Sequence, residues 1–179
     1  MEVRIASSRD IPALHALIES AYRGDSARLG WTHEADLLDG QRTDAAELQT
    51  IIGDSRQHML IHEAQTGIDA CIAINEKSGG LVYLGMVTVA PQRQAAGLGR
   101  AMLSAAESLA ADTLGATHAE MTVIERRHEL IAWYERRGYR RTGERRPFPR
   151  HDPRAGIPKC DDLDFIVLEK DLRSPSSEG

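Results

Sequence analysis

The chain has 179 residues and a formal net charge of -5, with 41% hydrophobic and 27% charged residues. This length can bury a core without disulfides or a structural metal, and the composition excludes collagen-like, coiled-coil and strongly disordered classes. The negative charge argues against a general affinity for nucleic acid, and no apolar run reaches the length of a membrane span. We therefore expect one soluble domain over residues 1–172 and a disordered tail rich in Ser, Pro and Gly over 173–179.

The two cysteines favour a reducing, cytoplasmic location. Cys71 and Cys160 lie far apart and lack the spacing of a disulfide framework or a zinc site. The N-terminus carries charged residues and lacks the apolar stretch of a signal peptide. We expect a cytoplasmic protein with neither a membrane nor a nucleic-acid partner.

The first half of the chain is predicted to contain a strand over 2–6 and an amphipathic helix that follows the cap candidates Ser7, Ser8 and Asp10. Residues 23–44 have no clear period and are interpreted as a shaped loop with one helical turn. A helix over 44–52 follows. Two apolar blocks, 58–64 and 70–75, are separated by a turn at 65–67 and predict a hairpin.

The second half begins with the strongest predicted strand, 81–89, in which Gly85 suggests a bulge. A long helix over 97–113 presents one apolar face. The pattern then predicts a strand over 118–124, a helix over 127–137, a strand over 139–145, a proline-rich loop over 147–159 and a last strand over 163–169. The order of elements indicates a mixed α/β fold without internal repeats.

The turn between the 81–89 strand and the 97–113 helix has the features of an anion-binding site. Two glycines, Gly97 and Gly99, let backbone approach a bulky anion, and the free N–H groups of the first helical turn carry a partial positive charge. The glycines alone would also be compatible with a tight connection. Neither the G-x-G-x-x-G pattern of dinucleotide-binding folds nor the Gly-Lys-Ser/Thr ending of a phosphate loop is present.

This turn resembles the signature of the GNAT superfamily of N-acetyltransferases, in which Gln or Arg is followed by two residues, Gly, one residue, and Gly or Ala. Gln94-Ala95-Ala96-Gly97-Leu98-Gly99 matches it, as do the upstream Val89-x-Pro91 and the downstream Arg100-x-x-Leu103. The segment from Ala132 to Tyr139 resembles the family's helix that ends in Tyr before a Gly-Tyr strand start. The likeness covers nearly the whole chain.

The resemblance implies a three-layer α/β fold, with a central, mostly antiparallel, splayed sheet flanked by helices. It implies acetyl-CoA, or another acyl-CoA, as co-substrate and no metal. The co-substrate would lie between strands 81–89 and 118–124, where a backbone N–H near Met86 or Val87 would polarise the thioester carbonyl. The implied cofactor-binding residues are Met86, Val87, Thr88, Val89, Gln94, Ala95, Ala96, Gly97, Leu98, Gly99, Arg100 and Arg127.

For catalysis, the resemblance implies that Tyr134 donates a proton to the departing CoA thiolate. A lysine-like amine needs a base, because its deprotonation at neutral pH costs about 4 to 5 kcal/mol. Some relatives use a glutamate on the strand before the turn, but Tyr83 falls near that position. The candidate bases are Glu120 and Glu125, with an acidic residue of the early loop or an ordered water as alternatives.

The acceptor, a small-molecule or peptide primary amine, is expected to contact the variable segments 23–44 and 147–159. Glu34, Asp36 and Asp39 would either attract a cationic amine or form a solvated face. The function predicted is direct acetyl transfer in a ternary complex; the alternative is a non-catalytic acyl-CoA sensor. RNA binding by the arginine-rich residues 126–154 is less favoured than a salt-bridged surface. Homodimers are common in the family.

Overall fold

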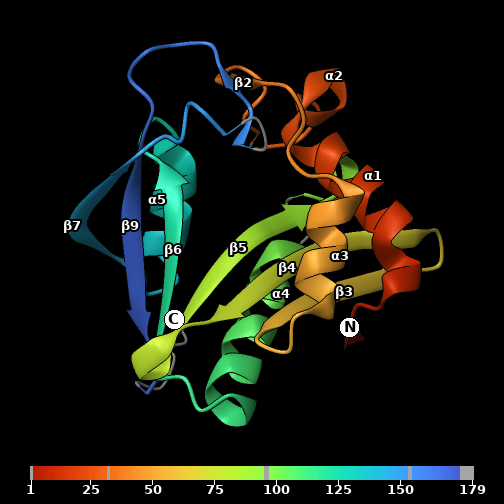
Figure 1. Ribbon diagram of the computed structural model, residues 1–179, viewed down its shortest axis with the longest axis vertical. Helices are drawn as coiled ribbons and strands as arrows, with labels where there is room; N and C mark the ends of the chain where they lie inside the picture. The colour runs from red at the N-terminus through yellow and green to blue at the C-terminus, as the bar shows by residue number, and fades with distance from the viewer. Residues whose placement is uncertain (1, 32, 95–96, 153–154, 174–179) are drawn as a thin grey trace.

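Seven strands form the main sheet of this computed structural model, which describes residues 2–31, 33–94, 97–152 and 155–173 (Figure 1). In spatial order they are β1 (Val3–Ile5), β3 (Gln57–Ala64), β4 (Gly67–Glu76), β5 (Leu81–Val89), β6 (His118–Ile124), β9 (Asp164–Asp171) and β7 (Arg140–Pro147). Neighbouring strands are antiparallel except β5 and β6, which run parallel. The predicted mixed, mostly antiparallel α/β fold is confirmed.

Helices cover both faces of this sheet. They are α1 (Ile11–Tyr22), the short α2 (Gly24–Ala27), α3 (Ala45–Gly53), α4 (Leu98–Ser108), which continues as a π-helical turn over Leu109–Thr113, and α5 (His128–Glu135). The α1 and α3 helices lie on one face, and α4 and α5 lie on the other (Figure 1). None of the helices in the described ranges is long and apolar enough to cross a membrane.

Local sequence accounts for where the first helices begin. A capping box joins Ser7 to Asp10 just before α1, and Arg4 also binds the Asp10 carboxylate, at 2.8 Å. Asp44 caps α3 by accepting a hydrogen bond from the Glu47 amide at 2.7 Å. Each cap satisfies N–H groups that the first helical turn cannot pair.

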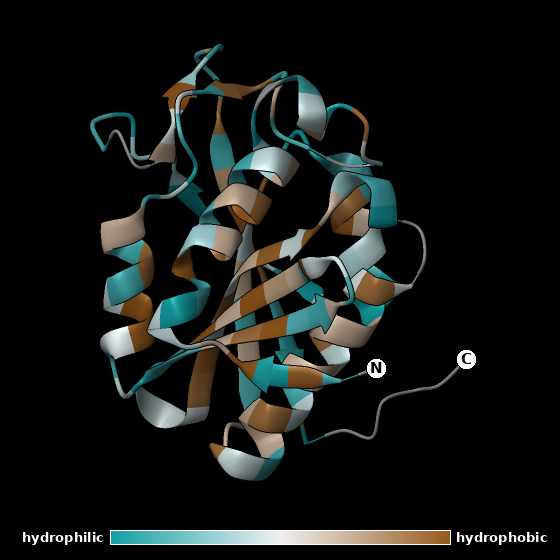
Figure 2. Ribbon diagram, turned by 90° about the vertical axis from the view of Figure 1, so that its right-hand side faces the viewer, coloured by the Kyte–Doolittle hydropathy of each residue, from teal (hydrophilic) through white to brown (hydrophobic). Residues whose placement is uncertain are grey.

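The apolar residues divide into cores on the two faces, and Figure 2 shows hydrophobic residues concentrated along the central strands. On one face, Leu14 and Ile18 of α1 pack with Leu48 of α3 and with the strands. On the other, Met102 and Leu103 of α4 are buried in a core to which β3, β4 and β5 contribute. Burial alternates along β5 because successive side chains point to opposite faces of the sheet and one face is more deeply covered than the other.

The strands β5 and β6 pair over only three residues before they separate. Leu81, Val82 and Tyr83 pair with His118, Ala119 and Glu120. Beyond these pairs the two strands diverge, and the main sheet splits into two halves (Figure 1). The Tyr83 hydroxyl lies 2.7 Å from the Thr122 hydroxyl, at the point of separation. This divergence confirms the predicted splay and gives access to backbone on the inner edges of β5 and β6.

A β-bulge bends β5 close to its carboxyl end. Its pairing with β4 shifts between Cys71 and Ala73, and Met86 has a φ of 49°, in the left-handed region that non-glycine residues rarely adopt. The Met86 carbonyl accepts a hydrogen bond from the Thr88 hydroxyl at 2.8 Å. Gly85, where the sequence suggested a bulge, still pairs with Ala73, and the bulge lies directly after it, at residues 86 and 87. Strained backbone of this kind is frequently found at functional sites.

The two segments predicted to be irregular loops pair with each other above the open end of the sheet. Residues of β2 (Leu38–Asp39) form an antiparallel ladder with β8 (Ile157–Pro158). Leu38 also packs with Ile124 and Phe148 in a small separate core. The predicted tail is not tested, because residues 174–179 lie outside the described chain.

Candidate functional site

A first hollow lies between the carboxyl end of β5, the start of α4 and the helix α5. Its lining includes three cofactor-binding residues predicted on β5, Val87, Thr88 and Val89. The remaining lining residues are Ala21, Tyr22, Trp31, Gln94, Gly97, Gly99, Arg100, Arg127, Leu130, Trp133, Tyr134 and Arg137. Four aromatic side chains and three arginines therefore surround one space, which suits a ligand with both apolar and anionic parts.

The amino end of α4 is open toward the first hollow. Gly97, its N-cap, has a φ of 79°, and no atom lies within 4 Å of where a Cβ would stand. The first α-helical bond is donated by Ala101 to the Gly97 carbonyl, so the amides of residues 98 to 100 have no partner within the helix. The arrangement fits an anion such as a pyrophosphate.

Other predicted residues of the turn differ in how they contribute. The Leu98 side chain is buried in the core on this face of the sheet, so only its backbone can face a ligand. Gln94 donates a hydrogen bond to the Val89 carbonyl at 3.2 Å, which holds the turn against the strand. The predicted residues Ala95 and Ala96 lie outside the described residues.

A second hollow adjoins the first, on the side of β2, α3 and β8. It is lined by polar groups from distant segments, including Glu34, Arg42, Glu47, Tyr83 and Thr122, and by Met86 of the bulge. Five residues line both hollows: Tyr22, Val87, Arg127, Leu130 and Tyr134. The two spaces therefore meet beside the bulge of β5.

Tyr134 of α5 lies at this junction. Its side chain is buried and makes edge contacts with the rings of Trp133 and Tyr139, at centroid distances of 5.0 and 5.8 Å. Burial, assisted by the nearby Tyr22, raises the pKa of the Tyr134 phenol well above its usual range. Within the described chain its hydroxyl has no hydrogen-bond partner. Tyr134 is thus a protonated phenol that can donate to a ligand.

Tyr22 was not identified from the sequence, yet it contacts the bulge directly. Its hydroxyl donates a hydrogen bond to the Val87 carbonyl at 2.7 Å. The residue lies at the end of an amphipathic helix and is 65 positions away from Val87, so sequence spacing gave no signal of this contact. Because that carbonyl is engaged, the Val87 amide is the group better placed to bind a ligand here.

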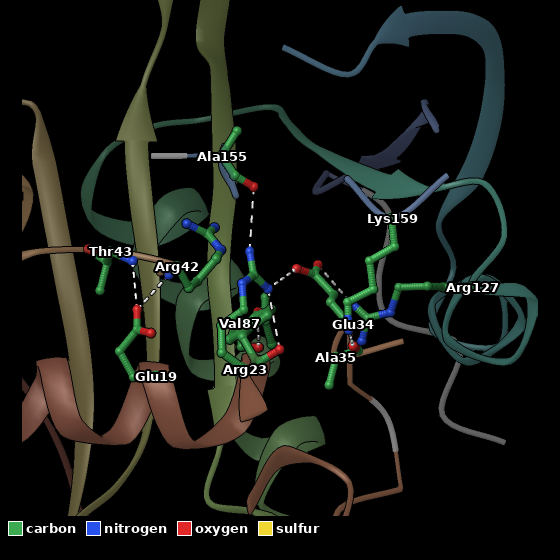
Figure 3. A network of polar contacts seen from close by, with 11 residues as sticks. Glu19, Arg23, Glu34, Ala35, Arg42, Thr43, Val87, Arg127, Ala155 and Lys159 are labelled. Carbon is green, nitrogen blue, oxygen red and sulfur yellow. Dashed lines mark hydrogen bonds and ion pairs between the residues drawn. The ribbon is translucent and has the colours of Figure 1, made fainter. Parts of the chain in front are cut away.

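A buried ion-pair network crosses the second hollow (Figure 3). Glu34 binds Arg23 at 2.8 Å and Arg127 at 3.0 Å, and the three side chains are only 11%, 6% and 10% exposed. Burial alone would raise the pKa of the Glu34 carboxyl, but Arg127, Arg42 and Arg23 outweigh it and hold that pKa below its usual value. Glu34 is therefore a fixed anion and a weak candidate for a base.

The two carboxylates predicted as bases both lie in ion pairs and line neither hollow. Both oxygens of Glu120 accept from Arg146, at 2.9 and 3.2 Å. Glu125 pairs with Arg145, which lowers the pKa of the Glu125 carboxyl. The geometry thus brings Tyr134 to the junction but does not bring these glutamates there.

Other charged side chains predicted to face an acceptor or RNA are paired within the chain. Asp36 binds Arg28 at 3.1 Å, and Asp39 binds Lys159 at 3.0 Å. In the arginine-rich segment, Arg126, Arg141, Arg145 and Arg146 pair with Asp162, Glu135, Glu125 and Glu120. This segment is the salt-bridged surface that sequence analysis favoured. The described residues contain no cluster of three or more His, Cys, Asp or Glu suited to a metal ion.

Comparisons with solved structures extend over nearly the whole chain. The protein smu.2055 from Streptococcus mutans UA159 is 16% identical, with a TM-score of 0.72, over 96% of this chain and 99% of its own. The ribosomal-protein-S18-alanine N-acetyltransferase from Escherichia coli is 15% identical, with a TM-score of 0.71, over 99% and 97%. A variant of spermidine N-acetyltransferase SpeG from Vibrio cholerae is 13% identical, with a TM-score of 0.67, over 96% and 95%.

At these low identities, the structural similarity shows a shared fold only. The family is assigned from a match of the sequence to a family model. No curated protein sequence matches the chain. A family model described as an acetyltransferase (GNAT) domain matches residues 33–149, which is more than half of the chain. The match includes β5, the turn and start of α4, and Tyr134 of α5. The chain therefore belongs to the GNAT acetyltransferase family.

Proposed function

We propose that the protein is an N-acetyltransferase that moves an acetyl or similarly short acyl group from acetyl-CoA to a primary amine, by direct attack in a ternary complex. The observation that carries this proposal is the meeting of two hollows at shared residues, among them Val87 and Tyr134. Ligands bound in the two hollows at once would have their reacting groups held together at this junction, which lowers the entropic barrier to transfer.

The first hollow has the features required for acetyl-CoA. Acetyl-CoA brings an activated thioester and an anionic pyrophosphate. The amides of residues 98 to 100 would donate to the pyrophosphate, and the Arg100 side chain would add a positive charge. Gly97 supports this assignment, because the space beside it is open where any other residue would project a side chain.

The bulge of β5 would orient a backbone N–H group toward the thioester carbonyl of the co-substrate. The left-handed φ of Met86 turns the strand, and Tyr22 fixes the Val87 carbonyl. A backbone N–H at 86 or 87 would then polarise the thioester carbonyl, since a fixed donor stabilises charge that develops on oxygen. Tyr134, buried and protonated, would give its proton to the departing thiolate. The raised pKa of the phenol opposes this transfer, so the fixed position of the hydroxyl beside the thiolate would have to assist it.

The base for the amine stays open to test. Glu120 and Glu125 remain the predicted bases, although arginines occupy both carboxylates. An ordered water between the amine and a more distant group is the alternative. A base would show itself as a variant that lowers kcat/KM at neutral pH and removes the acidic limb of the pH profile.

The test is calorimetric titration with acetyl-CoA, followed by thiol release with a panel of amines. Gly97→Trp should abolish binding, because the new side chain would enter the space for the pyrophosphate. Any substitution at Gly97 also strains its backbone, so Gly115→Trp is the matched control. Gly115 is likewise exposed, has a φ of 66° and has no atom within 4 Å of its Cβ position, but it lines neither hollow.

The outcomes separate the candidate functions. Tight binding that is lost only in Gly97→Trp, with CoA released by an amine, would support the acetyltransferase. Binding without turnover across a broad panel would favour a non-catalytic acyl-CoA sensor. If the native protein does not bind acetyl-CoA, or if both variants lose binding equally, the assignment of the first hollow is wrong.

A further inference from the structure

Arg42 places a cation in the second hollow that forms no ion pair with any described residue. Its backbone amide and that of Thr43 donate to the Glu19 carboxylate at 2.6 and 2.9 Å, which fixes the loop before α3 (Figure 3). Its guanidinium is half-buried and lies over the Tyr22 ring, 5.3 Å from the centroid. Within the described chain it makes no ion pair and donates no side-chain hydrogen bond. A partly desolvated guanidinium with unused donors is suited to bind an anion.

Attraction of a cationic acceptor was one of the two roles considered for the acidic loop, but its carboxylates already bind cations of the protein. Glu34 is neutralised by Arg23 and Arg127, as described above. Asp36 and Asp39 bind Arg28 and Lys159. A polyamine would therefore have to displace ion pairs already formed within the protein. An acceptor with several positive charges and no negative one does not match these surroundings.

Glu47, a carboxylate near Arg42, favours an acceptor that carries a positive as well as a negative group. Glu47 also lines the second hollow, and one of its oxygens accepts from the Thr43 hydroxyl at 2.7 Å. Burial lowers the pKa of the Arg42 guanidinium, but Tyr22, Glu34 and Glu47 outweigh it and raise that pKa. Glu47 forms no ion pair with Arg42 in the described part of the chain. Arg42 and Glu47 line the same hollow and form no ion pair among the described residues, so together they suit a zwitterion such as an amino acid.

The position of Arg42 relative to the bulge sets the size of the acceptor. The Tyr22 ring lies under Arg42, and its hydroxyl binds Val87 at the junction of the hollows. An anion bound to Arg42 would therefore stand about one tyrosine side chain away from the reacting centre. Building on the proposed acetyl transfer, we propose that the acceptor is a small amine that also carries a carboxylate or a similar oxyanion, and that Arg42 binds this anionic group.

The experiment compares matched acceptors, amino acids and their carboxamides, on the native protein, Arg42→Gln and Arg28→Gln. The native protein should prefer the acids. Arg42→Gln should raise KM for the acids about 10- to 100-fold, the range for a lost charged hydrogen bond, and leave the carboxamides within about threefold. Arg28→Gln is the control, because Arg28 is exposed, pairs with Asp25 and Asp36, and lines neither hollow. Aminosulfonates and aminophosphonates would show which oxyanion is preferred.

Several results would overturn the inference while leaving acetyl transfer intact. These are equal use of acids and carboxamides, a preference for polyamines, or an equal loss for both acceptor types in Arg42→Gln. If no amine reacts although acetyl-CoA binds, the proposed function fails instead. The inference is then decided by calorimetric titration of the amino acids into the protein–CoA complex. It stands if an acid binds to the native protein and not to Arg42→Gln, and falls otherwise.

Discussion

Replacing Glu34 with glutamine tests the buried ion-pair network most directly. Glu34→Gln keeps the shape of the side chain but removes the negative charge from between Arg23 and Arg127, whose side chains are only 6% and 10% exposed. Removal of one partner from a buried ion pair typically costs about 3 to 5 kcal/mol, because the remaining charges lose their compensation. In a domain of this size, that corresponds to a fall in Tm of about 6 to 20 °C.

The assay is urea unfolding followed by circular dichroism, with a thermal scan beside it. Asp36→Asn is the matched control, because Asp36 pairs with Arg28 at the surface, where the two side chains are 68% and 48% exposed. Its effect should stay below about 1 kcal/mol. If Glu34→Gln stays within about 1 kcal/mol of the native protein at an unchanged m-value, the network does not hold the fold as we argue.

The difference in stability between the native protein and Glu34→Gln should depend on pH. The folded pKa of Glu34 lies below its ordinary value, so its contribution is fully present above that ordinary value, near 4.3, and is lost as pH falls toward the folded pKa. The difference in unfolding free energy between the native protein and Glu34→Gln should therefore be constant near neutral pH and shrink below about pH 4. A constant difference down to pH 3 would contradict this sign.

Two further predictions concern catalysis. Tyr134→Phe should lower kcat by about 100-fold and leave the affinity for acetyl-CoA within about twofold, since only the proton donor is removed and the ring still packs. An unchanged kcat would exclude Tyr134 as the acid. If Glu120 or Glu125 is the general base, its replacement by Gln should lower kcat/KM at pH 7 by at least about 100-fold. Activity close to native in both would leave an ordered water as the proton acceptor.

Much of the fold was predictable because it rests on local patterns. The strands over Leu81–Val89 and His118–Ile124 have the bounds that sequence analysis predicted, since a run of apolar and β-branched residues followed by a turn signal is sufficient to define them. The start of α4 follows from Gly97 in the same way. By contrast, β2 and β8 have two residues each, too few to show any period.

The polar part of the site was harder to predict, because it depends on contacts between distant segments. Glu34 and Arg127 are 93 positions apart, and Tyr22 and Val87 are 65 apart. No spacing in the sequence indicates such pairs. The acidic loop was therefore interpreted either as a surface for a cationic acceptor or as a solvated face, and Arg42 was not singled out. The bulge was placed at Gly85 because glycine suggests one, whereas pairing with β4 determines its position at Met86.

Stability alone does not require this buried network to be charged. Apolar residues of similar volume often replace a buried ion pair without loss of stability. If the charges of Arg23, Glu34 and Arg127 contribute to function, they do so by fixing the positions of the segments that they join. Arg23 also reaches the Ala155 carbonyl at 3.4 Å, and Arg127 is the N-cap of the helix that carries Tyr134. We infer that the network holds the acceptor-side segments against α5. Glu34→Gln, assayed where it is still folded, should therefore raise KM for the amine; an unchanged KM would limit the network to stability.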